Sequence, residues 1–343
     1  MVQKDVTLIW LNTMKTIVQE SSTDVFPAGL KVGLSSSDVD EMREQSIFWP
    51  IEIKQLGRGR FQGDILGVHT THLQLSTSTR SLGVSIRGAA PADTSVISFL
   101  LDPEPTFSFR GQPLLMNQAL AIRDNEDLEI TALGASRLVT LVCRTKLIEA
   151  KTLLLTGQSF DQLRSQERLF FDPAEYQCRA KRLLSMVHTL YARQEPLSGF
   201  EESLVEDEIL QIALVGILPS EDVARKPGRL MLAKKAEAFI LDNLEAAPSI
   251  ADLCSHVGCS ERTLHLGFKE RFGLSPKAYV LLLRLNGVHE DLRAAGTTRT
   301  ITEVAMDWGF FHLGRFSQQY TRLFTQSPRR TCQQVRWPFP RNN

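Results

Sequence analysis

One sequence pattern occurs twice in the last third of the chain, and this duplication constrains the fold more than any other feature. Ile250 corresponds to Ile301 at an offset of 51 residues, and Phe272 corresponds to Phe324 at an offset of 52. The offset changes by one within a predicted turn, where an inserted residue costs least. The pattern therefore predicts two structural units of similar fold, one after the other.

The first unit has the signals of two short helices. Ser249 can cap a helix over residues 250–257, and Gly258 allows the left-handed turn that ends it. Ser260 can cap a second helix over residues 261–272. Two short helices joined by a tight turn with glycine are typical of a helix-turn-helix, whose second helix enters the major groove of DNA.

A longer helix is predicted between the two units, over residues 276–295. Pro276 stands at its first turn, a position that favours proline. Twenty helical residues span about 30 Å, close to the roughly 34 Å of one DNA turn. This helix could place the second helices of the two units in successive major grooves.

At this point residues 230–335 resemble the DNA-binding domain of the AraC/XylS family of bacterial transcription regulators. The resemblance depends on Phe-Lys-x-x-Phe-Gly-x-Ser-Pro at residues 268–276, and on Gly309-Phe310 with downstream Phe316-Ser317, Tyr320 and Ser327-Pro328. It implies base-reading positions in both units: Arg262, His265, Leu266, Leu313, Gly314, Ser317 and Gln318. It also suggests phosphate contacts from Ser260, Thr263, Lys269, Arg315 and Arg322.

The chain departs from the family pattern at a few of these positions. Thr325 stands where the family usually has glycine, so the last turn of the second unit could end differently. Leu266, Leu313 and Gly314 are poor hydrogen-bonding residues, and base readout would depend on Arg262, His265 and Gln318, plus apolar contact with thymine methyl groups. We expect the first unit to bind more specifically than the second.

Charge is distributed unevenly along the chain, although the formal net charge is zero. Residues 229–343 hold 16 basic and 10 acidic side chains, whereas residues 1–228 hold 23 basic and 29 acidic ones. The basic part is the one expected to meet DNA phosphates. We expect double-stranded promoter DNA and RNA polymerase as partners.

The N-terminal part, residues 1–222, is predicted to be an α+β domain for sensing or dimerisation. Residues 48–146 contain short alternating runs separated by glycine and proline, which favours a sandwich or barrel. Residues 147–218 have helical spacing, and residues 219–229 are typical of a linker because they hold two prolines and many charges. The expected fold class is therefore α+β, with an all-α DNA-binding domain following the β-rich one.

The segment Gly59-Arg60-Phe61-Gln62-Gly63-Asp64 is similar, less specifically, to the N-terminal half of the ethanolamine-operon regulators of the same family. That resemblance implies a domain that senses a small molecule or dimerises. A homodimer through this half is expected, with the apolar face at residues 183–190 as either plain core or dimer contact. Trp49 and Phe170-Phe171 could line an effector pocket, although aromatic residues are usually core. The effector-binding residues stay unknown.

Two other classes of function stay open for the N-terminal half. One is an enzyme or metal sensor fused to the DNA-binding domain, with Cys143 as the nucleophile; Cys143 has no flanking glycine, and a buried strand cysteine is favoured. The other is a protein-interaction module without a small ligand. Two sets of residues invite a metal-site interpretation, but their spacing fits poorly: Cys254, His256, Cys259 and His265, and the pair His69 and His72. We expect no catalytic residues, no metal and no cofactor.

The composition favours a cytoplasmic location. The five cysteines are scattered and odd in number, which fits a reducing compartment. The longest apolar run, residues 209–218, is half of the roughly 20 residues that cross a bilayer. The first 18 residues have no clean apolar segment with a cleavage site, so no membrane contact or export is expected.

Overall fold

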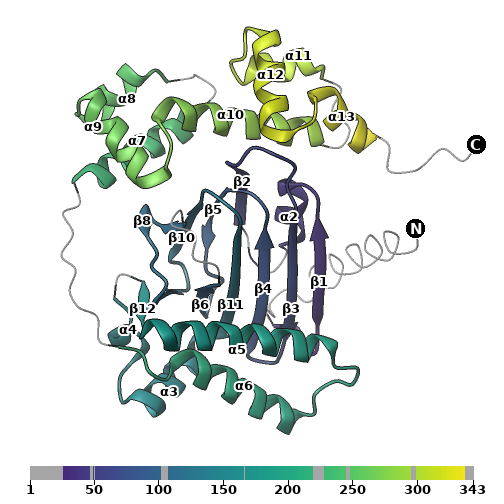
Figure 1. The fold of residues 1–343 in the computed structure, drawn as a ribbon, viewed down its shortest axis with the longest axis vertical. Helices are drawn as coiled ribbons and strands as arrows, with labels where there is room; N and C mark the ends of the chain where they lie inside the picture. Colours follow the sequence, from purple (N-terminus) through teal and green to yellow (C-terminus); the bar gives the residue numbers. More distant parts are fainter. Residues whose placement is uncertain are drawn as a thin grey trace, which may run out of the picture.

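The computed structural model describes residues 26–46, 49, 51–101, 107–165, 167–218, 228–244, 248–294 and 299–336. These residues form a β-rich domain with helices on one side and a separate group of helices on the other, as Figure 1 shows. The predicted fold class is confirmed: a β sandwich with packed helices precedes an all-α domain. Residues 219–227 of the predicted linker lie outside the described residues.

Two antiparallel sheets make up the sandwich. Sheet A, in its spatial order, contains β1 (Lys31–Ser36), β3 (Gly63–His69), β4 (Leu73–Arg80), β11 (Ser136–Arg144), β6 (Thr94–Leu100), β9 (Gln118–Arg123) and β12 (Arg168–Phe170). Sheet B contains β2 (Ile51–Gln55), β5 (Val84–Ala89), β10 (Asp127–Ala132), β7 (Phe107–Phe109) and β8 (Gln112–Pro113). The short alternating runs predicted within residues 48–146 are strands of these sheets, among them β4, β5 and β11.

Alternation along the strands builds two cores on either side of sheet A. On β4, Leu73 and Leu75 are fully buried against the helices, while Gln74 and Ser76 point into the space between the sheets. A second cluster, which includes Val84 of β5, fills much of the space between sheets A and B. Sheet A is therefore covered on both faces.

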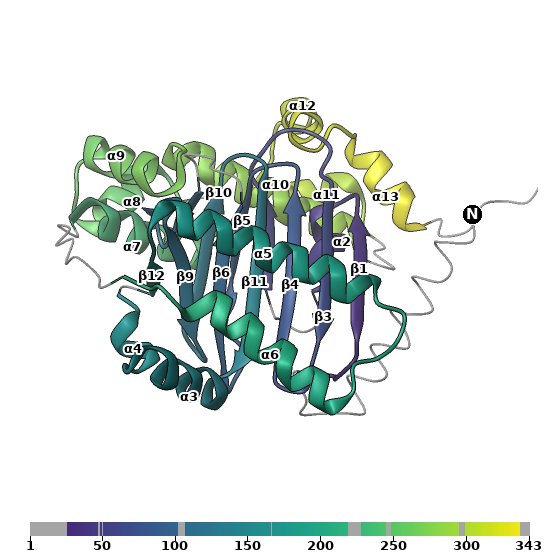
Figure 2. The same cartoon turned by 60° about the horizontal axis from the view of Figure 1, so that its bottom comes forward.

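Four described helices cover the outer face of sheet A: α3 (Thr145–Thr156), α4 (Phe160–Leu163), α5 (Pro173–Ala192) and α6 (Gly199–Leu214). Figure 2 shows α5 and α6 lying across its strands. Asp172 caps α5, and Ser198 forms a capping box with Glu201 at the start of α6. The predicted apolar face at residues 183–190 packs on sheet A, with Leu183 and Val187 fully buried, so it is core in this structure.

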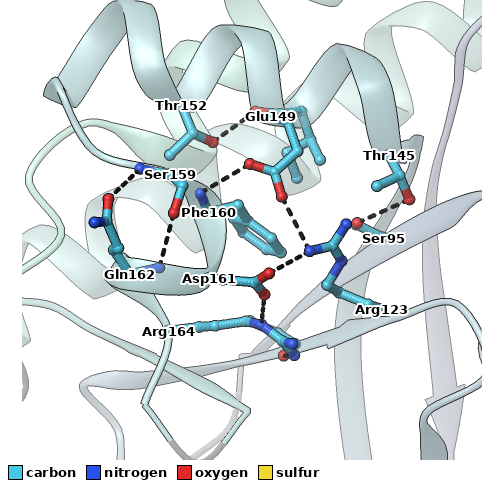
Figure 3. A network of polar contacts seen from close by, with 12 residues as sticks. Ser95, Arg123, Thr145, Glu149, Thr152, Ser159, Phe160, Asp161, Gln162 and Arg164 are labelled. Carbon is cyan, nitrogen blue, oxygen red and sulfur yellow. Dashed lines mark hydrogen bonds and ion pairs between the residues drawn. The ribbon is translucent and has the colours of Figure 1, made fainter.

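An ion-pair network attaches α3 and α4 to the sheet, as Figure 3 shows. Arg123 at the end of β9 contacts Glu149 of α3 and Asp161 of α4. Arg164 follows α4 and contacts Asp161 and Glu126. Shared carboxylates on bidentate arginines fix geometry better than isolated pairs do.

The first strand and helix among the described residues lie upstream of residue 48, where the predicted β-rich region begins. β1 pairs with β3 at the edge of sheet A, and α2 (Val39–Gln45) packs between β1 and β2. β1 is partly exposed along most of its length, so its side chains do not alternate clearly between apolar and polar. An edge strand of this kind leaves a weak sequence signal.

The all-α domain contains seven described helices, all listed here with their bounds: α7 (Gly228–Asp242), α8 (Ile250–Val257), α9 (Glu261–Phe272), α10 (Pro276–Arg293), α11 (Ile301–Asp307), α12 (Leu313–Phe324) and α13 (Pro328–Arg336). Two separate apolar clusters hold them together. The N-terminal half of α10 contributes Tyr279 and Leu283 to the first cluster, and its C-terminal half contributes Val288 and Leu292 to the second.

Candidate nucleic-acid interface

The first helix-turn-helix consists of α8 and α9, with the predicted caps in place. Ser249 accepts a hydrogen bond from the amide of Asp252, and Gly258 ends α8 with φ 68°. Ser260 accepts from the amide of Thr263 at the start of α9. Leu264 and Phe268 fix the inner face of α9 because both are fully buried.

The outer face of α9 carries most of the side chains that the resemblance assigned to DNA. Arg262, His265, Leu266 and Lys269 are exposed. Leu266 is 41% exposed, so part of its apolar side chain is accessible on this face. The hydroxyls of Ser260 and Thr263 lie 2.8 Å apart, so the predicted phosphate contacts from these residues would come from the cap of the helix itself.

The second helix-turn-helix consists of α11 and α12. Thr300 and Glu303 form a capping box on α11, whereas His312 precedes α12 without a side-chain capping bond. Phe316 and Tyr320 form its buried face. The exposed residues include most of the predicted DNA-contacting positions: Gly314, Arg315, Ser317, Gln318 and Arg322.

Leu313 differs from the other predicted base-reading positions. It is only partly exposed and packs against the apolar cluster of the second unit. Because that contact takes up part of the side chain, less of it is available to a thymine methyl group than the sequence suggested.

The two units end in the same backbone conformation despite different residues. Gly273 ends α9 with φ 67°, and Thr325 ends α12 with φ 54° and ψ 17°. The expected difference at Thr325 is therefore absent from the backbone of this turn. The threonine adopts a left-handed conformation that disfavours β-branched residues.

Helix α10 connects the units and is held rigidly at the second one. Trp308 donates a hydrogen bond from its indole nitrogen to Asp291 at 2.8 Å, and its ring lies against Gly287 so closely that a Cβ there would collide with it. Its 18 residues span about 27 Å. Figure 1 shows α9 and α12 on either side of α10.

Sheet B carries the all-α domain on its outer face. Arg87 of β5 pairs with Glu237 of α7, and Tyr279 of α10 donates a hydrogen bond to the same carboxylate. Arg271 of α9 pairs with Glu129 of β10 and donates to the carbonyl oxygen of Arg110 at 2.6 Å. On α9, Arg271 lies on the buried face, whereas the predicted DNA-contacting residues Arg262 and His265 are exposed.

A second set of contacts joins α10 to β2. The side chain of Asn286 accepts from the amide of Gln55 at 2.9 Å and donates to its carbonyl oxygen at 3.0 Å. The side chain of Gln55 donates to the carbonyl oxygen of Leu323 at 2.9 Å. The sequence pattern did not predict Asn286 or Arg271 as contact residues. Both side chains are at least 93% buried. The sequence feature that could have identified them is a polar residue on the buried face of an amphipathic helix.

The third set of contacts surrounds His289 of α10. Its Nε2 lies 2.8 Å from Asp38, and its Nδ1 lies 2.6 Å from the hydroxyl of Tyr320. Arg293 also contacts Asp38, at 2.8 Å. Asp38, Asp40 and His289 are close enough together to hold a metal ion, but both ring nitrogens of His289 already have protein partners. The cluster is accounted for as a contact between the two domains.

The two carboxyl groups of this cluster have opposite pKa shifts. Burial raises the pKa of Asp40 to about 6, helped by the charge of Asp38 and opposed by His289 and Arg43. Burial acts in the same direction on Asp38, but the hydrogen bond and charge of His289, together with Arg293, outweigh it and lower the pKa of Asp38 to about 2.

The residues of the alternative interpretations do not form a site. Cys143 is fully buried in β11, and burial raises the pKa of its thiol, which disfavours the thiolate that a nucleophile needs. Among the described residues, no metal-binding group includes Cys254, His256, Cys259 or His265, and none includes His69 or His72. His256 instead stacks on Phe239, and His72 contacts Glu206. No described helix is long and apolar enough to cross a membrane.

Comparisons with known proteins agree with this geometry. The family described as "Helix-turn-helix domain" matches residues 253–334. The chain is 31% identical over 104 residues to a "Probable thc operon regulatory protein" of Rhodococcus erythropolis, and 34% identical over 99 residues to a "XylDLEGF operon transcriptional activator" of Pseudomonas putida. These matches cover 30% and 29% of this chain, and 31% of each relative.

A solved structure shows the same similarity. The chain is 30% identical to a probable AraC family transcriptional regulator from Rhodopseudomonas palustris, covering 31% of this chain and 97% of that one, with a TM-score of 0.30. The chain therefore spans about a third of the length of the curated relatives it matches, whereas it spans nearly all of this solved chain.

Proposed function

Because the C-terminal third of this chain is the DNA-binding domain of an AraC/XylS-family transcription regulator, we propose that the protein binds promoter DNA with α9 and α12 in successive major grooves. The observation that supports the proposal is that most of the predicted DNA-contacting residues on both helices are exposed. The length of α10, about 27 Å, approaches one turn of DNA. Regulation is then a matter of binding, without chemistry.

The two helices divide the recognition unequally in this proposal. Arg262 and His265 present hydrogen-bond donors to base edges, and Leu266 presents apolar surface to thymine methyl groups. On α12, base contacts come from Ser317 and Gln318, with Gly314 allowing close approach of the backbone. The phosphate contacts come from Ser260, Thr263, Lys269, Arg315 and Arg322.

The partners of the whole chain are also proposals. A regulator that occupies a promoter meets RNA polymerase there, in the cytoplasm, and we propose that it recruits or blocks the polymerase. The β-rich domain is proposed to bind an effector and to form a homodimer. Four apolar side chains are exposed on the contacting helices α3 and α6, and we propose that they take part in the dimer contact: Leu153, Leu154, Phe200 and Leu204.

The proposal is tested by comparing Arg262→Ala with Arg315→Ala on a promoter fragment and on random DNA, with affinity measured by fluorescence anisotropy at several salt concentrations. Losing a bidentate base contact from Arg262 should cost about 1–3 kcal/mol on the promoter and little on random DNA. Losing a phosphate contact from Arg315 should weaken binding to the promoter and to random DNA by the same factor. It should also lower the slope of log affinity against log salt concentration by about one. An equal loss on both DNAs for Arg262→Ala would exclude base reading by this residue.

A further inference from the structure

A cavity of about 110 Å³ lies between sheets A and B. Its volume is several times the roughly 10–15 Å³ that one water molecule requires. Its two walls differ in chemistry. The polar wall is a row on β4, made by Gln74, Ser76, Ser78 and Arg80, whereas sheet B contributes an apolar wall. The space therefore suits a small molecule with one polar end and an apolar body.

Arg80 stands at the end of the polar row and is only 7% exposed. Its Nε and Nη1 atoms are buried and make no hydrogen bond within the part of the chain that the structure describes. Ser136 lies directly opposite Arg80 on β11, and its hydroxyl is also buried without a partner among the described residues. Burial lowers the pKa of Arg80 to about 10, so the guanidinium is still charged at neutral pH.

Two other arginines with little exposure, at the contact between the domains, have carboxylate partners. Arg271 pairs with Glu129, and Arg87 pairs with Glu237. The described residues that line the cavity include no aspartate or glutamate, and Arg80 is the only charged one among them. Because an uncompensated buried charge is costly, the missing counter-charge at Arg80 needs an explanation from outside the described chain.

We propose that this cavity binds a small carboxylic acid with an apolar body, whose carboxylate is held by Arg80 and Ser136. A guanidinium binds a carboxylate through two parallel hydrogen bonds, and the hydroxyl of Ser136 can donate a third. The apolar body then lies against Ile51, Ile86, Leu128 and Ile130 of sheet B, with Trp49 at the side. This inference depends on the proposed function only for its effect on transcription, since it names the effector class of the regulator.

The lining favours a carboxylate over a free inorganic anion. A phosphate dianion would bring a second charge to a cavity with a single described cation, and its remaining oxygens would face an apolar wall. A monovalent acid matches the single charge and uses the apolar wall as well.

The test is thermal unfolding of the purified full chain with hexanoate, its neutral counterpart hexanamide, or inorganic phosphate. No DNA is present, so a failure here is distinct from a failure to bind promoters. Hexanoate should raise the melting temperature with saturation, by about 5–10 °C at about 100 times its dissociation constant. Hexanamide and phosphate should have little effect at the same concentrations.

Variants locate the site. Arg80→Gln should fold, because it removes an uncompensated charge, and should lose the hexanoate shift. Arg182→Gln is the matched control, because Arg182 is exposed on α5 and should keep the full shift. If Arg80→Gln does not fold, the comparison of hexanoate with hexanamide on the wild-type protein still tests whether binding requires the carboxylate.

Four results would overturn the proposal. The first is an equal shift with hexanoate and hexanamide, and the second is a phosphate shift as large as that of hexanoate, which would indicate a free-anion site. The third is an undiminished hexanoate shift in Arg80→Gln. The absence of any shift with straight-chain acids from butanoate to octanoate at millimolar concentration would overturn it as well.

Discussion

Replacing Thr325 by glycine should stabilise the protein. Thr325 ends α12 at φ 54° and ψ 17°, where an L side chain costs about 1–2 kcal/mol. Glycine adopts this conformation freely, but it loses about 0.5–1 kcal/mol more conformational entropy on folding. The difference predicts a gain of about 0.5–1 kcal/mol in the free energy of unfolding.

The other helix ends of the same domain supply matched controls. Gly258 ends α8 at φ 68°, and a Cβ there would meet no atom within 4 Å, so Gly258→Ala isolates the backbone cost, a loss of about 1 kcal/mol. Gly273 ends α9 at φ 67°, and a Cβ there would collide with the side chain of Leu133. Gly273→Ala should therefore cost more than Gly258→Ala.

Urea unfolding followed by circular dichroism measures all three variants, with the midpoint as the readout at an unchanged slope. The expected order of stability is Thr325→Gly, wild type, Gly258→Ala and Gly273→Ala. A destabilised Thr325→Gly beside a normally destabilised Gly258→Ala would refute the argument from backbone strain.

Two further predictions concern the domain contact and the dimer. Asp40 has its pKa raised to about 6 in the folded protein from 3.8, so its contribution to stability is complete below pH 3.8 and is lost as the pH rises through 6. Asp40→Asn should therefore be more stable than the wild type above pH 6, by up to about 3 kcal/mol. In chemical unfolding, its stability should also change less between pH 4 and 6 than that of the wild type. Equal stability of the two proteins at pH 7.5 would contradict this prediction. The proposed homodimer predicts a dimeric wild type in analytical ultracentrifugation and a monomeric double variant Leu154→Ser and Phe200→Ser, because a two-fold contact pairs the same apolar residues with one another. Leu115→Ser is the control, since Leu115 is a comparably exposed leucine elsewhere, and an unchanged dimer in the double variant would exclude this surface.

The helices of the DNA-binding domain could be predicted closely because local signals mark their ends. Ser249, Ser260 and Pro276 stand at helix starts, and glycines end α8 and α9. The contacts between the domains could not be predicted. Asn286 meets Gln55 across 231 residues of chain, and no local pattern names that partner.

The candidate cavity could not be predicted from the sequence either, because the pattern of a single strand does not show what packs against it. Alternation on β4 shows that Leu73 and Leu75 share one face and that Ser78 and Arg80 share the other. It does not show what each face meets. The leucines pack under helices, and the polar face, which would be solvent-exposed in a single sheet, points into the interior instead.

Sheet B is a single layer with different neighbours on its two faces. Ile86 and Ile130 line the cavity, while their strands present Arg87 and Glu129 to the helices that hold the recognition elements. If an occupant of the cavity changes the affinity for a promoter by some factor, the promoter must change the affinity for that occupant by the same factor. Protein molecules already bound to DNA would then respond to a different concentration of the acid than free protein molecules. Each promoter would therefore set the acid concentration at which its own bound regulator responds.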